Sequence, residues 1–134
     1  MTINEILQTP FWVIDILPKQ VPEKAGGQFF TIEKYFMEDD RIAGIKQKHI
    51  NLILKLNCYM EISIDDETNP SPAATAHEMR RRYVWIRLGD SMIISEPDDA
   101  HMTLFNPDEE LLELVREIAQ SEGLFVWQPE EGNF

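Results

Sequence analysis

The chain has 134 residues, of which 24 are Asp or Glu and 12 are Lys or Arg, so its formal net charge is −12 when histidine is neutral. Proteins bind the nucleic-acid backbone by neutralising phosphates with Lys and Arg, so this charge excludes a general nucleic-acid-binding protein. The hydrophobic fraction of 43% and the charged fraction of 27% are typical of a globular domain and not of a disordered chain. We therefore expect residues 1–134 to fold as a single domain.

Cysteine content and hydropathy indicate the compartment. The single cysteine, Cys58, cannot form an intramolecular disulfide, and residues 1–20 lack the basic region and uninterrupted apolar stretch of a secretory leader. The apolar stretch over residues 11–17, which contains Asp15, is much shorter than the roughly 20 residues that a membrane helix needs. The sequence thus predicts a cytoplasmic protein without a membrane-spanning segment.

The first predicted elements are a short helix over residues 2–8 and a strand over residues 11–17. Apolar residues recur at helical spacing in the helix, and Pro10 ends it because proline has no backbone N–H to donate. The strand is rich in β-branched and aromatic residues. Residues 18–27 are predicted as a loop, and residues 28–37 fit a helix and a strand equally well.

The next segments favour strands and a loop. Residues 50–56 and 60–64 alternate apolar and polar side chains, which predicts two strands, or one strand with a bulge at residues 57–59. Residues 65–77 are mostly turn-forming or small and include two prolines. We expect them to form a long mobile loop that is a candidate functional element.

A hairpin is the clearest local prediction. Strands over residues 83–88 and 91–95 enclose Gly89-Asp90, and glycine at the first position of a two-residue turn is what a type II′ hairpin requires. After a second turn, a third strand over residues 101–105 completes an antiparallel meander over residues 83–105.

The C-terminal part has the signals of a helix. Residues 106–109 supply Asn as the N-cap, Pro at the first helical position and Glu at the third. The predicted helix covers residues 107–122, Gly123 ends it, and a strand over residues 124–127 completes a βαβ-like unit. Together these patterns predict an α+β fold, a mainly antiparallel sheet of about five or six strands with the helix packed on one face. A helical segment around residues 29–37 could add to this cover.

Motifs for catalysis and metal binding are absent or incomplete. His77 and Glu78 begin like the zinc-binding helix of metalloproteases, but Arg81 stands where the second histidine is needed. The acidic segment 65–70 resembles half of a calcium loop but has proline in place of the required glycine. Cys58 lies beside apolar residues and is expected to be a buried small hydrophobe. The sequence predicts no metal site and no cofactor, and favours a binding protein over an enzyme, although acid–base catalysis by paired carboxylates stays open.

Several side chains could line a small-molecule pocket between the sheet and the loop over residues 65–77. These candidates are Arg82, Tyr83, Trp85, Arg87 and His101. Three of them alternate along one strand and share one of its faces, and the histidine could reach the same face from two strands away. Arg82 belongs to the only basic cluster of the sequence. This cluster could bind a phosphate or carboxylate, or could pair with the surplus of acidic residues on the protein itself.

Acidic residues are concentrated in the C-terminal part. Residues 96–134 contain eleven acidic residues and one basic residue, a net charge of −10, which leaves −2 for residues 1–95. Glu109 falls in the first turn of the predicted helix, where the helix dipole favours it. Glu113 and Glu117 lie four residues apart on one helix face and repel each other, so stability alone does not explain them.

The leading functional hypothesis is a small acidic binding protein, of the inhibitor or immunity type, that engages a basic protein partner through the face these three glutamates define. A patch of one sign accelerates encounter with an oppositely charged partner. One alternative is a small-molecule-binding or enzymatic domain with its pocket near Trp85 and Arg87. Another is a structural subunit of a homo-oligomer that pairs through edge strands over residues 11–17 or 124–127.

Overall fold

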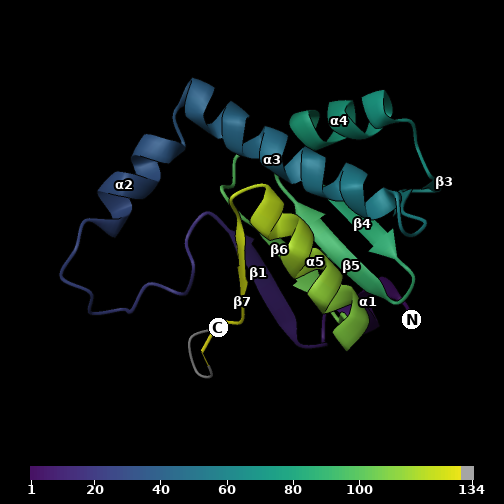
Figure 1. Ribbon diagram of the computed structural model, residues 1–134, viewed down its shortest axis with the longest axis horizontal. Coiled ribbons are helices and arrows are strands. Elements are labelled where there is room, and N and C mark those ends of the chain that lie inside the picture. Colours follow the sequence, from purple (N-terminus) through teal and green to yellow (C-terminus); the bar gives the residue numbers. More distant parts are fainter. Residues whose placement is uncertain (131–134) are drawn as a thin grey trace.

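A computed structural model describes residues 1–130, and within this range it has five helices and seven strands (Figure 1). In chain order these are α1 (Ile3–Ile6), β1 (Phe11–Asp15), α2 (Phe29–Phe36), α3 (Asp39–Asn57), β2 (Ser63–Ile64), β3 (Glu67–Thr68), α4 (Pro72–Arg81), β4 (Val84–Leu88), β5 (Ser91–Ser95), β6 (Met102–Phe105), α5 (Glu109–Ser121) and β7 (Phe125–Trp127).

The strands of residues 1–130 form one sheet in the order β3-β2-β4-β5-β6-β1-β7, and every neighbouring pair is antiparallel. This arrangement confirms the predicted α+β fold with an antiparallel sheet, which is slightly larger than expected. The predicted hairpin is also confirmed, because Leu88 pairs with Ser91 across Gly89-Asp90. Gly89 has a φ of +66°, a conformation that favours glycine at the first turn position.

Strand β1 is inserted between β6 and β7. It pairs with β6 from Phe11 to Ile14 and with β7 from Val13 to Asp15. Both partners are antiparallel to β1 and therefore parallel to each other. Strand β6, helix α5 and strand β7 thus form the predicted βαβ-like unit, with β1 inserted between its two strands. The expectation that residues 11–17 form an edge strand is wrong, and within residues 1–130 the edges of the sheet are β3 and β7.

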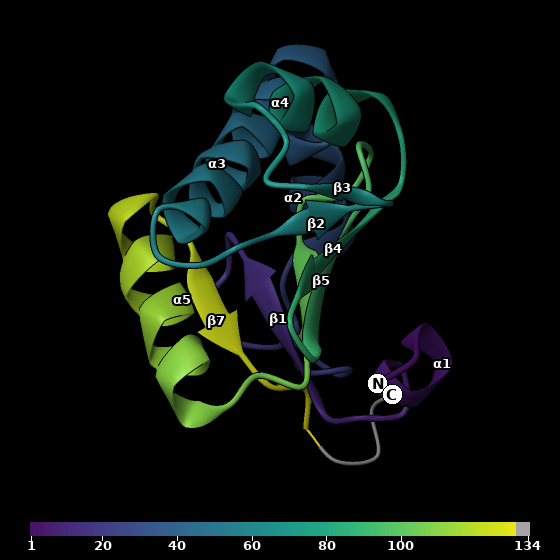
Figure 2. The ribbon, with the colours of Figure 1, turned by 90° about the vertical axis from the view of Figure 1, so that its right-hand side faces the viewer.

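Helices α3, α4 and α5 cover one face of the sheet, and α1 lies against the other (Figures 1 and 2). Successive side chains of a strand point to opposite faces, so Val84, Ile86 and Leu88 of β4 are all buried in the core below the three helices. Ile50 of α3 and Val115 of α5 are fully buried in the same core. The C-terminal helix thus packs on one face of the sheet, as predicted.

Residues 50–56 belong to α3, so the strand predicted there is wrong. A longer window that begins at Ile45 shows the reason, because Ile45, Leu52, Ile53 and Leu56 follow a helical period and are all buried. The helix packs against both the sheet and α5, which buries more than one narrow stripe of its surface. Apolar residues on that wide stripe produce an apparent alternation over seven positions. The predicted strand over residues 60–64 is reduced to the two residues of β2.

The long loop predicted over residues 65–77 is also wrong, because the segment contains β3 and most of α4. The side chain of Ser71 accepts a hydrogen bond of 3.1 Å from the amide of Ala74, and Pro72 is the first helical residue. Serine as the N-cap followed by proline is a recognised helix start. The small residues after Pro72 are therefore helical.

The N-cap of helix α5 lies two residues later than predicted. Asn106 has a φ of +57° and ends the chain segment from β6 in a left-handed turn. Asp108 is the N-cap instead, and its Oδ1 accepts a hydrogen bond of 2.7 Å from the amide of Leu111. The end of the helix is as predicted, because Gly123 follows it with a φ of +72°.

Candidate functional site

A pocket of about 330 Å³ opens on the sheet face opposite α3, α4 and α5. We call it the edge pocket, because it lies where β1 meets the edge strand β7. Its lining side chains are Val13, Asp15, Ile16, Leu17, Gln20, Val21, Phe29, Ile32, Glu33, Phe36, Ala100, His101 and Trp127. The sheet forms its floor, while α2 and the segment after β1 form its walls. Most of this surface is apolar, as in typical small-molecule sites.

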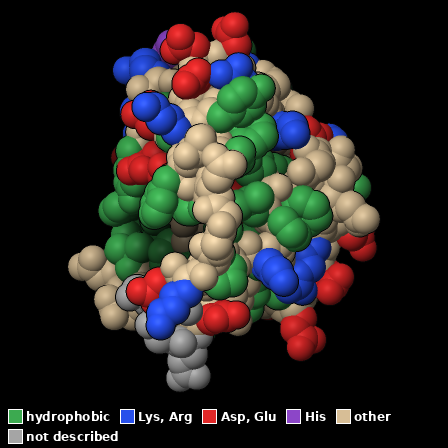
Figure 3. Space-filling model, turned by 90° about the vertical axis from the view of Figure 1, so that its left-hand side faces the viewer, with side chains coloured by type: hydrophobic (Ala, Val, Ile, Leu, Met, Phe, Trp, Pro, Cys, Tyr) green, Lys and Arg blue, Asp and Glu red, His purple; other side chains and the backbone are tan. Residues whose placement is uncertain are grey.

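Helix α2 forms one wall of the edge pocket. Phe29, Ile32 and Phe36 line it at helical spacing, which decides the ambiguity of residues 28–37 in favour of a helix. None of the α2 residues is buried, and Phe30, which does not line the pocket, is 81% exposed. Figure 3 shows hydrophobic side chains gathered on this side of the molecule, with charged side chains above and below them. The apolar stripe of α2 therefore borders a hollow and not a packed core.

The attachment of α2 to the rest of the protein includes contacts between Tyr35 and Arg41 of α3. The Nε of Arg41 donates a hydrogen bond of 2.7 Å to the carbonyl of Tyr35. The guanidinium carbon of Arg41 lies 3.8 Å from the centroid of the Tyr35 ring, a cation–π contact. These contacts hold α2 at the pocket without burying its side chains.

Asp15 lies close to two other polar side chains of the edge pocket, His101 and Trp127. Its Oδ1 accepts a hydrogen bond of 2.7 Å from the amide of Ile16, and burial raises the pKa of its carboxyl group. Extension of the β1–β6 register places His101 opposite Asp15 on the same face. The Nε1 of Trp127 donates a hydrogen bond of 3.1 Å to the carbonyl of Leu17, which fixes the indole ring in the pocket lining.

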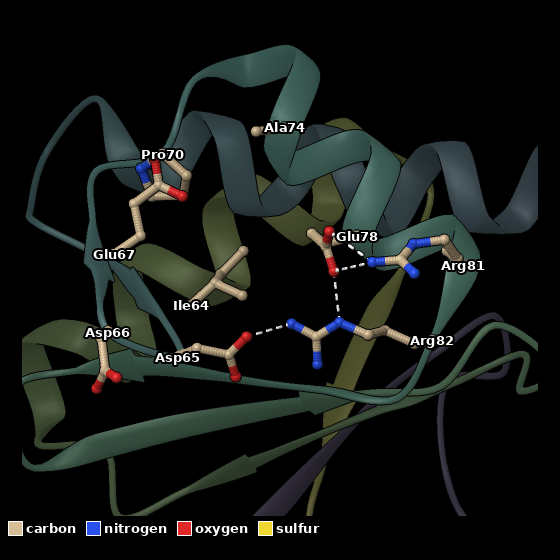
Figure 4. Close-up of a pocket in the computed structure, with 9 residues that line it drawn as sticks. All are labelled: Ile64, Asp65, Asp66, Glu67, Pro70, Ala74, Glu78, Arg81 and Arg82. Atoms are coloured by element: carbon tan, nitrogen blue, oxygen red, sulfur yellow. Dashed lines mark hydrogen bonds and ion pairs between the residues drawn. The ribbon is translucent and has the colours of Figure 1, made fainter.

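Arg82 belongs to a different depression, of about 640 Å³, which we call the charged hollow and which lies between α4 and the β2–β3 turn (Figure 4). Its Nη2 donates to Asp65 at 2.5 Å, and its Nε donates to Glu78. Arg81 also donates to Glu78 at 2.9 Å. Hydrogen bonds from Arg82 and Arg81 lower the pKa of Glu78 to about 2. The guanidinium of Arg82 is therefore already paired within the chain, and these pairs join α4 to the β2–β3 turn.

Tyr83 and Trp85 contact each other, with ring centroids 5.9 Å apart, but the predicted residues do not line one common pocket. Trp85 and Arg87 lie on the open sheet face as expected, but Trp85 packs against the apolar cluster under α1. The Nη2 of Arg87 donates to the carbonyls of Met1 at 3.1 Å and Gly89 at 3.2 Å. Tyr83 borders a shallow hollow of about 250 Å³ that it shares with His101. Of the five candidates, His101 alone lines the edge pocket.

The acidic residues of α5 border a groove of about 530 Å³ beside the turn that follows α3. We call it the acidic groove, and its lining side chains are Tyr59, Met60, Asp108, Glu110, Leu111, Glu113, Leu114 and Glu117. Two of the three predicted partner-binding glutamates are among them, whereas Glu109 is exposed outside the groove. Tyr59 is 72% exposed, so an aromatic ring stands beside four carboxylates.

A buried polar cluster escaped the sequence analysis. The Nζ of Lys46 lies 3.0 Å from Nδ1 of His49 and donates a hydrogen bond of 3.0 Å to Oγ of Ser95. The three residues are at most 3% exposed. Burial lowers the pKa of Lys46 to about 8 and, together with the charge of Lys46, lowers the pKa of His49 to about 3. Spacing of three residues on a helix is the signal that links Lys46 with His49, and it was hidden by the strand predicted from residue 50.

The sequence also predicted the absence of a metal site, the absence of a membrane-spanning segment and the burial of Cys58. No group of three His, Cys, Asp or Glu side chains within residues 1–130 is arranged to hold a metal ion. None of the helices in the same range has the length and apolar character needed to cross a membrane. Cys58 is exposed after α3, so the prediction that it is buried is wrong.

Comparisons of the chain with protein-family models, with curated proteins and with solved structures found no match.

Proposed function

We propose that this protein is a binding protein whose edge pocket takes a small, largely apolar ligand. The observation that carries this proposal is the apolar stripe of α2, which faces a hollow although it has the composition of a core-packing surface. Apolar surface exposed to water is unfavourable, by about 25 cal/mol for each Å² that a ligand could cover. A ligand that fills the hollow would complete the packing between α2 and the sheet.

The size and chemistry of the pocket suit ligand binding. Its volume of about 330 Å³ is at the lower end of the range of roughly 300–1,000 Å³ that is usual for ligand sites. The described lining contains no Ser, Thr or Cys that could act as a nucleophile. Asp15, His101 and Gln20 supply a few polar groups, which suits orientation of a bound molecule.

Phe36→Ala is expected to weaken the binding of a neutral aromatic probe, 2-naphthol, by about tenfold, which corresponds to about 1.4 kcal/mol of lost apolar contact. Binding is measured by titration, from the shift of the Trp127 indole N–H resonance, which is assigned with the variant Trp127→Phe. Phe30→Ala is the matched control, since it removes the same side chain from the same helix outside the pocket. We expect it to change the affinity by no more than about twofold. Equal effects of the two substitutions would contradict the proposal.

A second candidate function is the binding of a basic protein partner at the acidic groove. The observation that favours it is the exposed Tyr59 ring beside four carboxylates, because aromatic side chains are enriched at protein interfaces and carboxylates attract basic partners. The groove also lies within the C-terminal part that carries most of the net charge.

Reversal of two charges in the acidic groove, Glu113→Lys with Glu117→Lys, is expected to reduce recovery of a basic partner from native lysate by about tenfold at low salt. Asp66→Lys with Glu67→Lys is the control, because it changes the net charge equally on the exposed β2–β3 hairpin. Recovery of the partner is compared by quantitative mass spectrometry at two salt concentrations. A partner lost equally with both double variants, or one retained at high salt, would speak against the groove.

A further inference from the structure

We propose that the ligand of the edge pocket carries a positively charged amine on its apolar body, and that Asp15 receives this amine. This inference rests on the proposed function, and it adds the chemical class of the ligand. It is carried by the placement of two carboxylates, Asp15 on the floor and Glu33 on the α2 wall, in a lining that is otherwise mainly apolar.

Carboxylates outnumber the side chains that can be cationic in the described lining of the pocket. Asp15 and Glu33 belong to its lining, whereas no described lining residue is Lys or Arg, and His101 opposite Asp15 is the one described lining side chain that can carry a positive charge. An anionic ligand would be placed beside two carboxylates in a poorly hydrated site, which is unfavourable. The negative charge of the whole chain, −12, adds a field that attracts cations.

The surroundings of Asp15 explain why a cation is favoured over a neutral group. One of its oxygens accepts the amide of Ile16, so the carboxylate is held in a fixed orientation beside the pocket. Burial disfavours its charged form, as the raised pKa shows, and an opposite charge nearby would remove that penalty. A charge-assisted hydrogen bond from an ammonium group is roughly twice as strong as one between neutral groups.

The apolar part of the ligand would lie between α2 and the sheet. The rings of Phe29, Phe36 and Trp127 line this space. Aromatic faces also attract cations, so a ring beside the carboxylate would support the same head group. The geometry therefore fits a compact aryl-alkylamine better than an aryl-alkyl alcohol or acid.

Three probes of similar shape test the inference, namely 2-phenylethylamine, 2-phenylethanol and 3-phenylpropanoate. Each is titrated into the full chain at pH 7.5, and binding is followed by the indole N–H resonance of Trp127. We expect the amine to bind about tenfold more tightly than the alcohol, and the acid to bind more weakly than both. If the alcohol binds as tightly as the amine, the inference is overturned while the proposed pocket stands. If none of the three shifts the Trp127 resonance, the proposed function fails as well.

Variants locate the charge that is responsible. Asp15→Asn preserves the shape of the side chain, and it is expected to reduce the preference for the amine over the alcohol to about twofold or less. Asp66→Asn removes an exposed carboxylate outside the pocket and should leave the preference unchanged. An intact tenfold preference in a folded Asp15→Asn variant would overturn the role of Asp15. The comparison of probes in the unmodified protein decides the amine inference even if that variant does not fold.

Discussion

Substitution of Ile53 with alanine is expected to lower the free energy of unfolding by about 2–5 kcal/mol, the usual cost of truncating a fully buried isoleucine. Ile53 is 0% exposed and belongs to the main core cluster under α3. Truncation would remove contacts with the sheet and leave a cavity that the surrounding layers cannot fully close. Urea unfolding followed by far-ultraviolet circular dichroism measures this difference.

Leu54→Ala is the matched control, and it should cost less than half as much, because Leu54 is only partly buried. The pair discriminates between the helix and the strand first predicted for residues 50–56. In a strand, Leu54 would share the core face with Leu52 and Leu56, while Ile53 would face the solvent with Lys55. A larger effect for Leu54 than for Ile53 would therefore contradict the helix.

Acidification from pH 6.5 to pH 3 is expected to remove about 4 kcal/mol of stability through His49 alone. The pKa of His49 falls from an ordinary value of 6.5 to about 3 in the folded protein, chiefly because the ring is buried. In this pH range the unfolded chain binds a proton at His49 and the folded chain does not, so protonation favours unfolding. The contribution is fully present above pH 6.5 and is lost as the pH falls towards 3. Lys46 is protonated in both states throughout this range and adds no slope.

The contribution of His49 is isolated by comparing pH dependences. His49→Gln removes the titrating group, so its free energy of unfolding should fall less steeply with acid than that of the unmodified protein. His77→Gln is the control, because His77 is exposed on α4. Urea midpoints between pH 6.5 and 4 measure the difference, and equal slopes for His49→Gln and the unmodified protein would refute the assignment. Overall stability of the variants does not enter the comparison.

The fold could be predicted wherever local signals and tertiary packing agree. The meander over residues 83–105 combines strict alternation with Gly89, whose positive φ is required by the turn itself. The helix over residues 107–122 has a clear apolar stripe and a glycine stop, and only its cap was displaced, by the left-handed turn at Asn106. These elements needed little information from distant parts of the chain.

Prediction failed where tertiary contacts decide the outcome. Within residues 50–56, a strand pattern and a helical pattern both place Ile50 and Leu56 in the core. The local sequence does not distinguish the two patterns, and burial of the segment on two sides decides for the helix. For residues 65–77 the signal was present, since Ser71-Pro72 is a helix start, but two prolines and small residues favoured a loop. Ser71 and Pro72 form a specific helix start inside a segment whose overall composition is typical of a loop.

The candidate site was predictable only in part. The open sheet face was anticipated from the alternation of Tyr83, Trp85 and Arg87, and His101 does line the edge pocket. Most of the rest of its lining comes from residues 13–36. Trp127 of β7 joins it from more than 100 residues further along the chain, because β7 pairs with β1, and no local pattern reveals this pairing. The sequence therefore indicates which residue types could form a site, but it does not indicate which of them are close together in the folded protein.

The position of β1 has a consequence for how the chain is made. Its two partners lie about 90 and about 110 residues further along the sequence, and contacts of such separation form late and slowly. The meander can pair as soon as it leaves the ribosome, whereas β7 joins the sheet only through β1. The apolar residues of β1 are therefore expected to be unpaired during most of the translation of the chain. During that time they are open to chaperones and to the same strand of other nascent chains.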